Sequence, residues 1–216
     1  MNKLLIWGAG GHGKVVLDVV RAQATFTDIV FIDDGARISC GDFQGCRIVG
    51  DRTELTRLRA LGYTHFVVAI GCNDVRAKCF RAAFEAGIEP ATFIHPAAAV
   101  SRCATIAAGT VVMAKAVINA ASVVGTNCIV NSGAIVEHDC ILADHVHVAP
   151  GVVLGGGVGI GAYSLVGLNS SVLPGTEIGE RAIVGAGTVV LANVAPGDTV
   201  VGAPARSLRQ LATTDR

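Results

Sequence analysis

The chain has 216 residues, a length that suits one domain or two small ones. Half of it is apolar (51%) but only 5% is aromatic, so the core must be aliphatic, and that content excludes a disordered chain. Lysine plus arginine equals aspartate plus glutamate at 17 each, so no basic surplus exists to bind nucleic acid or an anionic membrane. The apolar run at residues 3–8 is too short for a signal peptide or a membrane span, which makes a cytoplasmic protein the expectation.

Residues 1–96 alternate apolar strands with helical patterns. Strands are predicted at 3–7, 29–32 and 66–70, and helices at 14–21, 53–61 and 74–86. Such alternation is typical of a parallel sheet covered on both faces by helices. Asn73 stands where it could cap the last of these helices.

A glycine pattern follows the first strand and opens the first helix. Gly8, Gly10 and Gly13 fit the G-x-G-x-x-G spacing, and Asp33 lies twenty residues beyond Gly13. The pattern raises the hypothesis of a nicotinamide-dependent oxidoreductase. We reject that hypothesis because 96 residues are too few for two mononucleotide-binding halves and a substrate domain. The loop can still bind a phosphate-containing ligand, because glycines and a helix N-terminus suit any diphosphate.

The second half repeats every six residues. From Val100 to Val190 every sixth residue is Val, Ile or Leu, sixteen in phase without a break. A period of six fits neither a helix nor a hairpin sheet, but it fits a solenoid with three flat faces and 18 residues per coil. The five coils would rise about 24 Å at ~4.8 Å each. We expect small residues to let each coil close, and corner glycines to supply positive φ.

The cysteines indicate neither a disulfide framework nor a metal site. Seven are present, an odd number, and none forms a C-x-x-C pair or a Cys/His cluster with zinc spacing. We therefore expect reduced cysteines that pack as small apolar residues, and no metal: Cys40, Cys46, Cys72, Cys79, Cys103, Cys128 and Cys140.

These features together resemble a known family, the hexapeptide-repeat acetyltransferases. The similarity is greatest to the group of nucleotide-sugar 4-amino N-acetyltransferases and sialic-acid O-acetyltransferases. Five segments carry it: 8–13 (GAGGHG), 32–34 (IDD), 69–73 (AIGCN), 137–139 (EHD) and 201–206 (VGAPAR). The resemblance implies a Rossmann-like α/β domain at 1–96 that binds the nucleotide sugar. It implies a left-handed parallel β-helix at 97–216 that carries the acetyltransferase activity, and a homotrimer with active sites between subunits.

The resemblance also implies site residues. Acetyl-CoA would be the co-substrate and a UDP-, dTDP- or GDP-linked amino sugar the acceptor. Residues of the glycine loop and of two later strand ends would hold the nucleotide sugar: Gly10, Gly11, His12, Asp33, Asp34 and Gly71. Residues of the β-helix would hold acetyl-CoA: His147, Gly156, Leu168, Ala186 and Arg206. Ala186 departs from the family's glycine, and Arg206 equally fits a solvated surface residue. Asp33 and Asp34 also fit a solvated strand end.

His138 is the candidate general base. It lies two residues past the inward-facing Val136, so it projects outward, and carboxylates flank it on both sides. A carboxylate fixes the imidazole tautomer and stabilises the imidazolium. Family resemblance favours Asp139 as the partner, with Glu137 the alternative. The amine would attack the thioester directly, and the Gly156 N–H would stabilise the oxyanion.

Two other functions fit the sequence. Attack by a hydroxyl group needs the same base, so O-acetylation of sialic acid or a related sugar is the alternative reaction. A non-catalytic scaffold that uses the solenoid for assembly is the third hypothesis.

Overall fold

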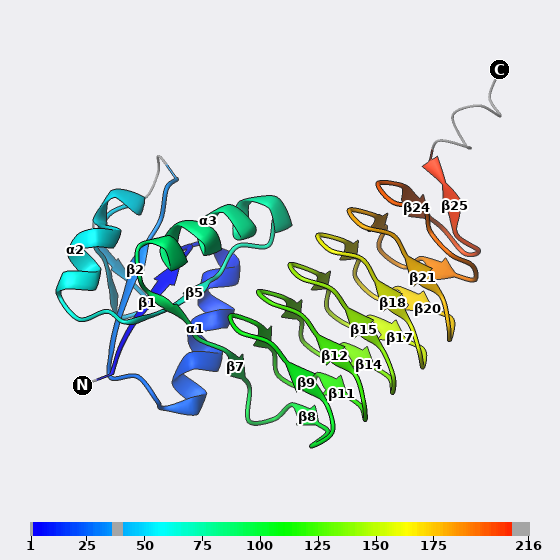
Figure 1. Cartoon of the computed structure of the whole chain (residues 1–216), viewed down its shortest axis with the longest axis horizontal. Coiled ribbons are helices and arrows are strands. Elements are labelled where there is room, and N and C mark those ends of the chain that lie inside the picture. The colour runs from blue at the N-terminus through cyan, green and yellow to red at the C-terminus, as the bar shows by residue number, and fades with distance from the viewer. Residues whose placement is uncertain (1, 36–40, 209–216) are drawn as a thin grey trace. The chain divides into compact units, whose positions relative to one another are not determined.

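The chain divides into two compact units, residues Met1–Pro96 and Ala97–Arg216. The computed structural model describes residues 2–35 and 41–208, so Cys40 lies outside the described residues. The order of the helices and strands is shown in Figure 1. In the described ranges no helix combines the length and apolarity that crossing a membrane requires.

The first unit is a mainly parallel sheet with the strand order β3-β4-β2-β1-β5-β6. Its strands are β1 (Lys3–Trp7), β2 (Asp28–Ile32), β3 (Gly41–Phe43), β4 (Cys46–Ile48), β5 (His65–Val68) and β6 (Glu89–Pro90), and β7 (Phe93–Ile94) follows near the end of the unit. Its helices are α1 (Gly11–Gln23), the 3₁₀ turn η1 (Arg52–Glu54), α2 (Leu55–Ala60) and α3 (Asn73–Glu85). The predicted alternation of strands and helices is confirmed, and the β3–β4 hairpin was not predicted.

Both faces of this sheet are covered. Every residue from Leu4 to Trp7 is buried, although successive side chains of a strand point to opposite faces. One face packs against α2 and α3 through an apolar cluster that includes Trp7, Leu55, Leu58, Phe66 and Ala83. Strand β1 lies between β2 and β5, so the chain changes direction across the sheet at β1. In open α/β sheets, ligands bind outside the carboxyl ends of strands at such a switch point.

The capping hypothesis for Asn73 is wrong. Helix α3 begins at Asn73, and Cys72 occupies the N-cap position. The Asn73 Oδ1 instead accepts a hydrogen bond of 2.7 Å from Arg76 Nη2.

The second unit is a parallel β-helix with three faces, as the six-residue period predicts (Figure 1). The first face holds β8 (Ala99–Val100), β11 (Val117–Ile118), β14 (Ile135–Val136), β17 (Val153–Leu154), β20 (Ser171–Val172) and β23 (Val189–Val190). The second holds β9 (Thr105–Ile106), β12 (Val123–Val124), β15 (Ile141–Leu142), β18 (Gly159–Ile160) and β21 (Glu177–Ile178). The third holds β10 (Val111–Val112), β13 (Ile129–Val130), β16 (His147–Val148), β19 (Leu165–Val166), β22 (Ile183–Val184), β24 (Thr199–Val201) and β25 (Arg206–Ser207).

Register follows the 18-residue coil from β8 to β23, and the last parallel pair, β22 with β24, is 16 residues apart. Val136 pairs with Leu154, and Val148 pairs with Val166. From Val112 to Val190 every inward aliphatic residue is buried. Buried hydroxyl groups tie successive coils together, because Ser122 Oγ donates to the carbonyl of Glu137 at 2.6 Å. The coils thus satisfy buried polar groups as well as burying apolar ones.

Corner glycines supply the expected positive φ at some turns, as Gly133, Gly157 and Gly175 do, each with φ 67°. The expectation needs a correction at the other turns. The left-handed position is the third residue after the inward aliphatic one, and non-glycine residues such as Asp139 (φ 59°) occupy it in many coils. The glycine directly after the aliphatic residue serves close packing instead. A Cβ on Gly125 would lie 2.7 Å from the Ala143 carbonyl carbon of the next coil.

Candidate active site

His138 and Asp139 form an exposed pair in the turn that joins the first face to the second. His138 Nδ1 lies 2.7 Å from Asp139 Oδ2, and the two side chains are 64% and 66% exposed. Asp139 holds the left-handed backbone position of the turn. With Nδ1–H donated to this carboxylate, the lone pair of Nε2 is the basic site of the imidazole. The pair therefore has the arrangement of a general base and its orienting carboxylate.

Glu137 turns away from the imidazole. Its Oε2 accepts a hydrogen bond of 2.9 Å from Asn119 Nδ2 on the preceding coil. Asp139 is thus the flanking carboxylate that contacts His138. The contact with Asn119 could have been predicted from the sequence, because residues 119 and 137 are 18 apart and so occupy the same position in successive coils.

Gly156 lies one coil beyond His138, directly against the imidazole. A Cβ at Gly156 would lie 2.5 Å from His138 Cε1 and 2.7 Å from Nε2. The neighbouring Gly157 N–H donates to the His138 carbonyl at 2.8 Å, which fixes the two turns against each other. Within residues 2–35 and 41–208, the Gly156 N–H has no backbone acceptor. Its position beside the base suits an oxyanion donor.

A shallow groove on the second face includes Asp139 of this pair in its lining. Three glycines contribute to its lining, and a Cβ on Gly159 would overlap the Glu177 carboxylate. The groove is lined by Asp139, Ile141, Gly157, Val158, Gly159, Ile160, Gly161 and Glu177.

The residues nominated for acetyl-CoA lie elsewhere on the β-helix. His147 is on the third face, where Asn131 Nδ2 lies 3.3 Å from its Nε2. Leu168 and Ala186 occupy turns between the third face and the first, and Arg206 is in β25 at the end of the third-face sheet. The third face is opposite the turn that carries His138. One chain therefore does not bring these four residues to the base, although it does bring Gly156.

The glycine loop lies at the carboxyl end of β1. Gly8 (φ 118°) and Gly13 are required by packing, because a Cβ on Gly8 would lie 2.7 Å from the Ala69 carbonyl oxygen and one on Gly13 would overlap the Gly8 carbonyl. Gly10 and Gly11 differ, since a Cβ on either would meet open space. Gly71, after β5, is likewise open. These three glycines lie on surfaces that an incoming ligand can approach closely.

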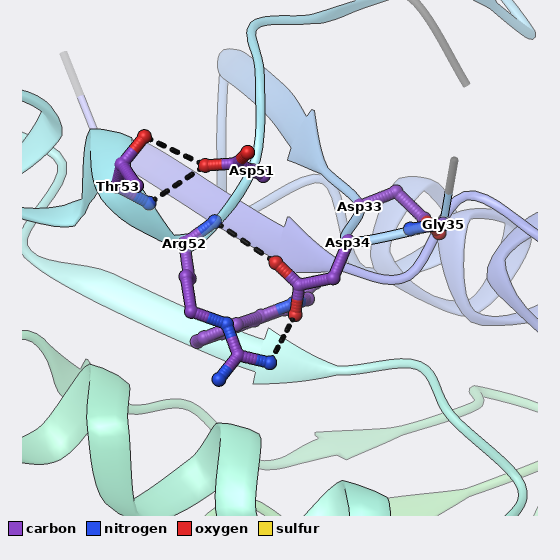
Figure 2. Close-up of polar contacts among 7 residues, drawn as sticks. Asp33, Asp34, Gly35, Asp51, Arg52 and Thr53 are labelled. Carbon is purple, nitrogen blue, oxygen red and sulfur yellow. Dashed lines mark hydrogen bonds and ion pairs between the residues drawn. The ribbon is translucent and has the colours of Figure 1, made fainter. Parts of the chain in front are cut away.

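Asp33 and Asp34 follow β2 at the same edge of the sheet, and both already make protein contacts. Asp33 Oδ2 accepts from the Ala9 N–H at 2.7 Å, which holds the glycine loop, and Oδ1 accepts from the Gly35 N–H at 2.7 Å. Asp34 accepts from the backbone N–H and the guanidinium of Arg52, at 3.0 and 2.8 Å (Figure 2). Asp34 Oδ2 also accepts from Trp7 Nε1 at 3.2 Å. The carboxylates thus shape the loop and keep only their remaining lone pairs for a ligand.

Two basic side chains, His12 at the start of α1 and Arg76 on α3, influence each other electrostatically. Burial, and secondarily the charge of Arg76, lowers the pKa of His12 from 6.5 to about 4, so its imidazole is neutral at pH 7. Arg76 is 1% exposed and binds the carbonyls of Ile70 and Gly71. Sequence reasoning missed Arg76. Its signal was an arginine on the apolar stripe of α3, three and seven residues before the buried Cys79 and Ala83.

Comparisons with known proteins agree with this architecture. Residues 3–83 match the family model of the PglD N-terminal domain. A mutant of perosamine N-acetyltransferase from Caulobacter crescentus, solved with CoA and GDP-perosamine, is 36% identical with a TM-score of 0.92, over 96% of this chain and 97% of that one. The acetyltransferase domain of PglB from Neisseria gonorrhoeae, solved with acetyl coenzyme A, is 39% identical with a TM-score of 0.91, over 96% and 100%. The chain belongs to this family of sugar N-acetyltransferases.

Curated relatives match over shorter spans. UDP-N-acetylbacillosamine N-acetyltransferase of Bacillus subtilis is 36% identical over 105 residues, which is 47% of this chain and 47% of that protein. A putative acetyltransferase of Schizosaccharomyces pombe is 41% identical over 46 residues, 22% of its length. The chain thus spans less than half the length of these two curated relatives.

The remaining cysteines and histidines lie outside the candidate active site. Burial raises the pKa of Cys140, which is the cysteine nearest to His138 in sequence. The six cysteines within the described ranges are unbridged, and those ranges hold no cluster of His, Cys, Asp or Glu that could bind a metal. His145 lies at a different corner, where its ring packs 4.8 Å from that of Tyr163. His65 is exposed at the start of β5.

Proposed function

We propose that the protein transfers an acetyl group from acetyl-CoA to the 4-amino group of a nucleotide-linked amino sugar. The observation that carries the proposal is the His138–Asp139 pair, with Nδ1 to Oδ2 at 2.7 Å, packed against Gly156 on a sugar N-acetyltransferase fold. Two structurally similar proteins were solved with CoA and GDP-perosamine or with acetyl coenzyme A, which supports this choice of substrates.

In the proposed reaction, His138 acts through Nε2. The neutral amine attacks the thioester carbonyl while Nε2 accepts a proton from the nitrogen, and Asp139 stabilises the imidazolium. The Gly156 N–H donates to the tetrahedral oxyanion. As the C–S bond breaks, the imidazolium returns the proton to the departing thiolate. Transfer is direct, because the buried Cys140 has a raised pKa and is unsuited to an acyl-enzyme.

The α/β unit, in this proposal, holds the nucleotide sugar through Gly10, Gly11, His12 and Gly71. Asp33 and Asp34 position the loop and offer their remaining lone pairs. UDP, dTDP and GDP are all candidate carriers. We place the enzyme in the cytoplasm, where its cysteines stay reduced.

We further propose that the enzyme is a homotrimer with active sites between subunits. Support comes from the placement of the acetyl-CoA residues. His147, Leu168, Ala186 and Arg206 lie away from His138 in one chain, so a second copy is needed to bring them to the base. Flat faces of a β-helix suit closure around a threefold axis.

The test measures CoA thiol release with acetyl-CoA and UDP-, dTDP- or GDP-linked 4-amino sugars. We expect release with at least one of these sugars, and His138→Asn should lower kcat on the order of 10²-fold or more. The matched control is His145→Asn, which changes the other corner histidine to a residue type that Asn127 and Asn169 show is accepted at the left-handed position.

Absence of release with all three carriers, or an unchanged kcat in His138→Asn, would reject the proposal. A product that mild alkali cleaves would identify an ester and hence O-acetylation.

A further inference from the structure

Arg52 is connected to the glycine loop by contacts that run along one edge of the sheet. The Ala9 N–H donates to Asp33 Oδ2 at 2.7 Å, and the Asp33 N–H donates to the Gly50 carbonyl at 3.0 Å. Gly50 precedes Arg52 by two residues. The segment that follows β4 therefore lies at the same edge as the segments that follow β1 and β2, where we place the nucleotide sugar.

Two neighbouring side chains orient Arg52 (Figure 2). The Arg52 Nη2 donates to Asp34 Oδ2 at 2.8 Å, and the Arg52 backbone N–H donates to Asp34 Oδ1 at 3.0 Å. The guanidinium carbon lies 5.9 Å from the ring centroid of Trp7, whose Nε1 donates to the same Asp34 oxygen. Asp34 thus accepts three hydrogen bonds, two of which hold Arg52 in place.

Much of the guanidinium remains exposed. The Arg52 side chain is 60% exposed, and among the described residues Asp34 is the one hydrogen-bond acceptor of its guanidinium. A guanidinium carries five N–H donors, so most of them stay available to a ligand. An exposed ion pair contributes little to stability, so the fold alone does not account for this arrangement. A fixed guanidinium fork is suited to a group that presents two adjacent acceptors.

Among the three candidate carriers, guanine matches this fork best. Guanine presents two acceptors, O6 and N7, on one edge, and arginine binds that edge with two hydrogen bonds. Thymine presents O4 beside a methyl group, and uracil presents O4 beside a C–H group, so either offers a single acceptor there. In sheets of this kind the diphosphate binds after the first strand and the ribose near the carboxylate after the second. The base then extends toward the segment after β4, which carries Arg52.

We propose that Arg52 selects guanine, by donating two hydrogen bonds to O6 and N7 of a GDP-linked amino sugar. This inference rests on the proposed function and narrows its carrier nucleotide to GDP. Asp34 and Trp7 are positioning residues, because they act on the base through Arg52. The glycine loop holds the diphosphate that all three carriers share, so Arg52 adds selectivity to a site of general affinity.

The experiment is isothermal titration of the full chain with GDP, UDP and dTDP. GDP should bind at least about tenfold tighter than the other two, and Arg52→Gln should weaken GDP about tenfold while it changes the Kd of UDP and dTDP less than about twofold. Arg52→Lys keeps the charge but not the fork, so it should also lose most of the preference for GDP. The matched control is Arg57→Gln, which removes another arginine of an exposed ion pair and should alter none of the three Kd values.

A modified nucleotide tests the same contact without changing the protein. 7-Deaza-GDP has a C–H group in place of N7, so the unaltered protein should bind it about fivefold or more weakly than GDP. Arg52→Gln should bind the two nucleotides within about twofold of each other. The measurement on the unaltered protein remains valid where the variant does not fold, and equal affinity for GDP and 7-deaza-GDP contradicts the inference.

Two other results overturn the inference and leave the proposed function intact. Equal weakening of GDP, UDP and dTDP in Arg52→Gln would show that Arg52 binds the phosphates. An unaltered protein that prefers UDP or dTDP, or has no preference, would show that guanine is not selected. Failure of the unaltered protein to bind any of the three diphosphates rejects the nucleotide-sugar assignment itself.

Discussion

Two groups of glycines, one in each unit of this enzyme, are small for opposite reasons. In the α/β unit, Gly10, Gly11 and Gly71 border open space, so no neighbouring atom of the folded chain would clash with a side chain there. In the β-helix, Gly125 and Gly167 lie against the backbone of the next coil, where a Cβ would approach within 2.7 and 2.6 Å. The difference separates two reasons for a small residue. Where φ is not left-handed, open space at a glycine leaves room for a ligand to approach, whereas a close backbone neighbour shows that the fold requires the glycine.

The largest effect is expected at Gly156, which belongs to the β-helix but serves the base. A methyl group there would lie 2.5 Å from His138 Cε1, so the imidazole must move. We expect Gly156→Ala to lower kcat on the order of 10²-fold, because misplacing a base disrupts proton transfer. Steady-state kinetics checks the loss, and thermal unfolding should show little change because the imidazole can turn into solvent. An undiminished kcat would show that the base does not depend on this contact.

A pair of glycine substitutions tests the comparison directly. Gly167→Ala places a Cβ 2.6 Å from the Val184 carbonyl oxygen, and we expect it to lower the free energy of unfolding by about 1–3 kcal/mol. Gly11→Ala meets open space at the start of α1 and should leave that free energy unchanged or slightly raised. Gly11→Ala should instead weaken nucleotide binding. Urea denaturation and nucleotide titration of both variants separate the two outcomes, and equal destabilisation would break the comparison.

An acid-dependent stability difference is expected from the α/β unit. The pKa of His12 falls from 6.5 to about 4 on folding, so between these values the unfolded chain binds more protons. Stability should therefore fall as the pH decreases from 6.5 to 4, with a contribution of about 3 kcal/mol from His12. His12→Asn should flatten this part of the profile of unfolding free energy against pH. The exposed His65→Asn is the control and should leave the slope as it is.

The smallest effect is expected at Cys140, in the β-helix. Burial raises the pKa of this thiol, and its Sγ lies 3.3 Å from the Gly155 carbonyl. Cys140→Ala should cost about 1 kcal/mol of unfolding free energy and leave kcat within about twofold. Steady-state kinetics measures kcat, and urea denaturation measures the free energy of unfolding. Loss of turnover in a folded Cys140→Ala protein would indicate an acyl-enzyme instead of direct transfer.

Much of the β-helix could be predicted because its pattern is local and repeated. The six-residue aliphatic period predicts an 18-residue coil. The coil length then predicts which residues are neighbours in successive coils, as the Asn119–Glu137 contact shows. The α/β unit was predicted less completely. The hairpin of β3 and β4 was missed because three-residue strands carry too short a pattern. Arg76 was missed because a basic residue on a helix is ordinarily solvated, and only tertiary packing buries it.

The sequence by itself determined the six-residue repeat, the change from an α/β pattern to that repeat near residue 96, and the candidate base His138 with a carboxylate on either side. Each of these depends on residues close together in the chain. Tertiary structure decided which carboxylate contacts the imidazole, which glycines are open, and that Arg76 is buried against the carbonyls of Ile70 and Gly71. Those outcomes depend on segments brought together from distant parts of the chain, and a linear pattern does not specify where such segments meet.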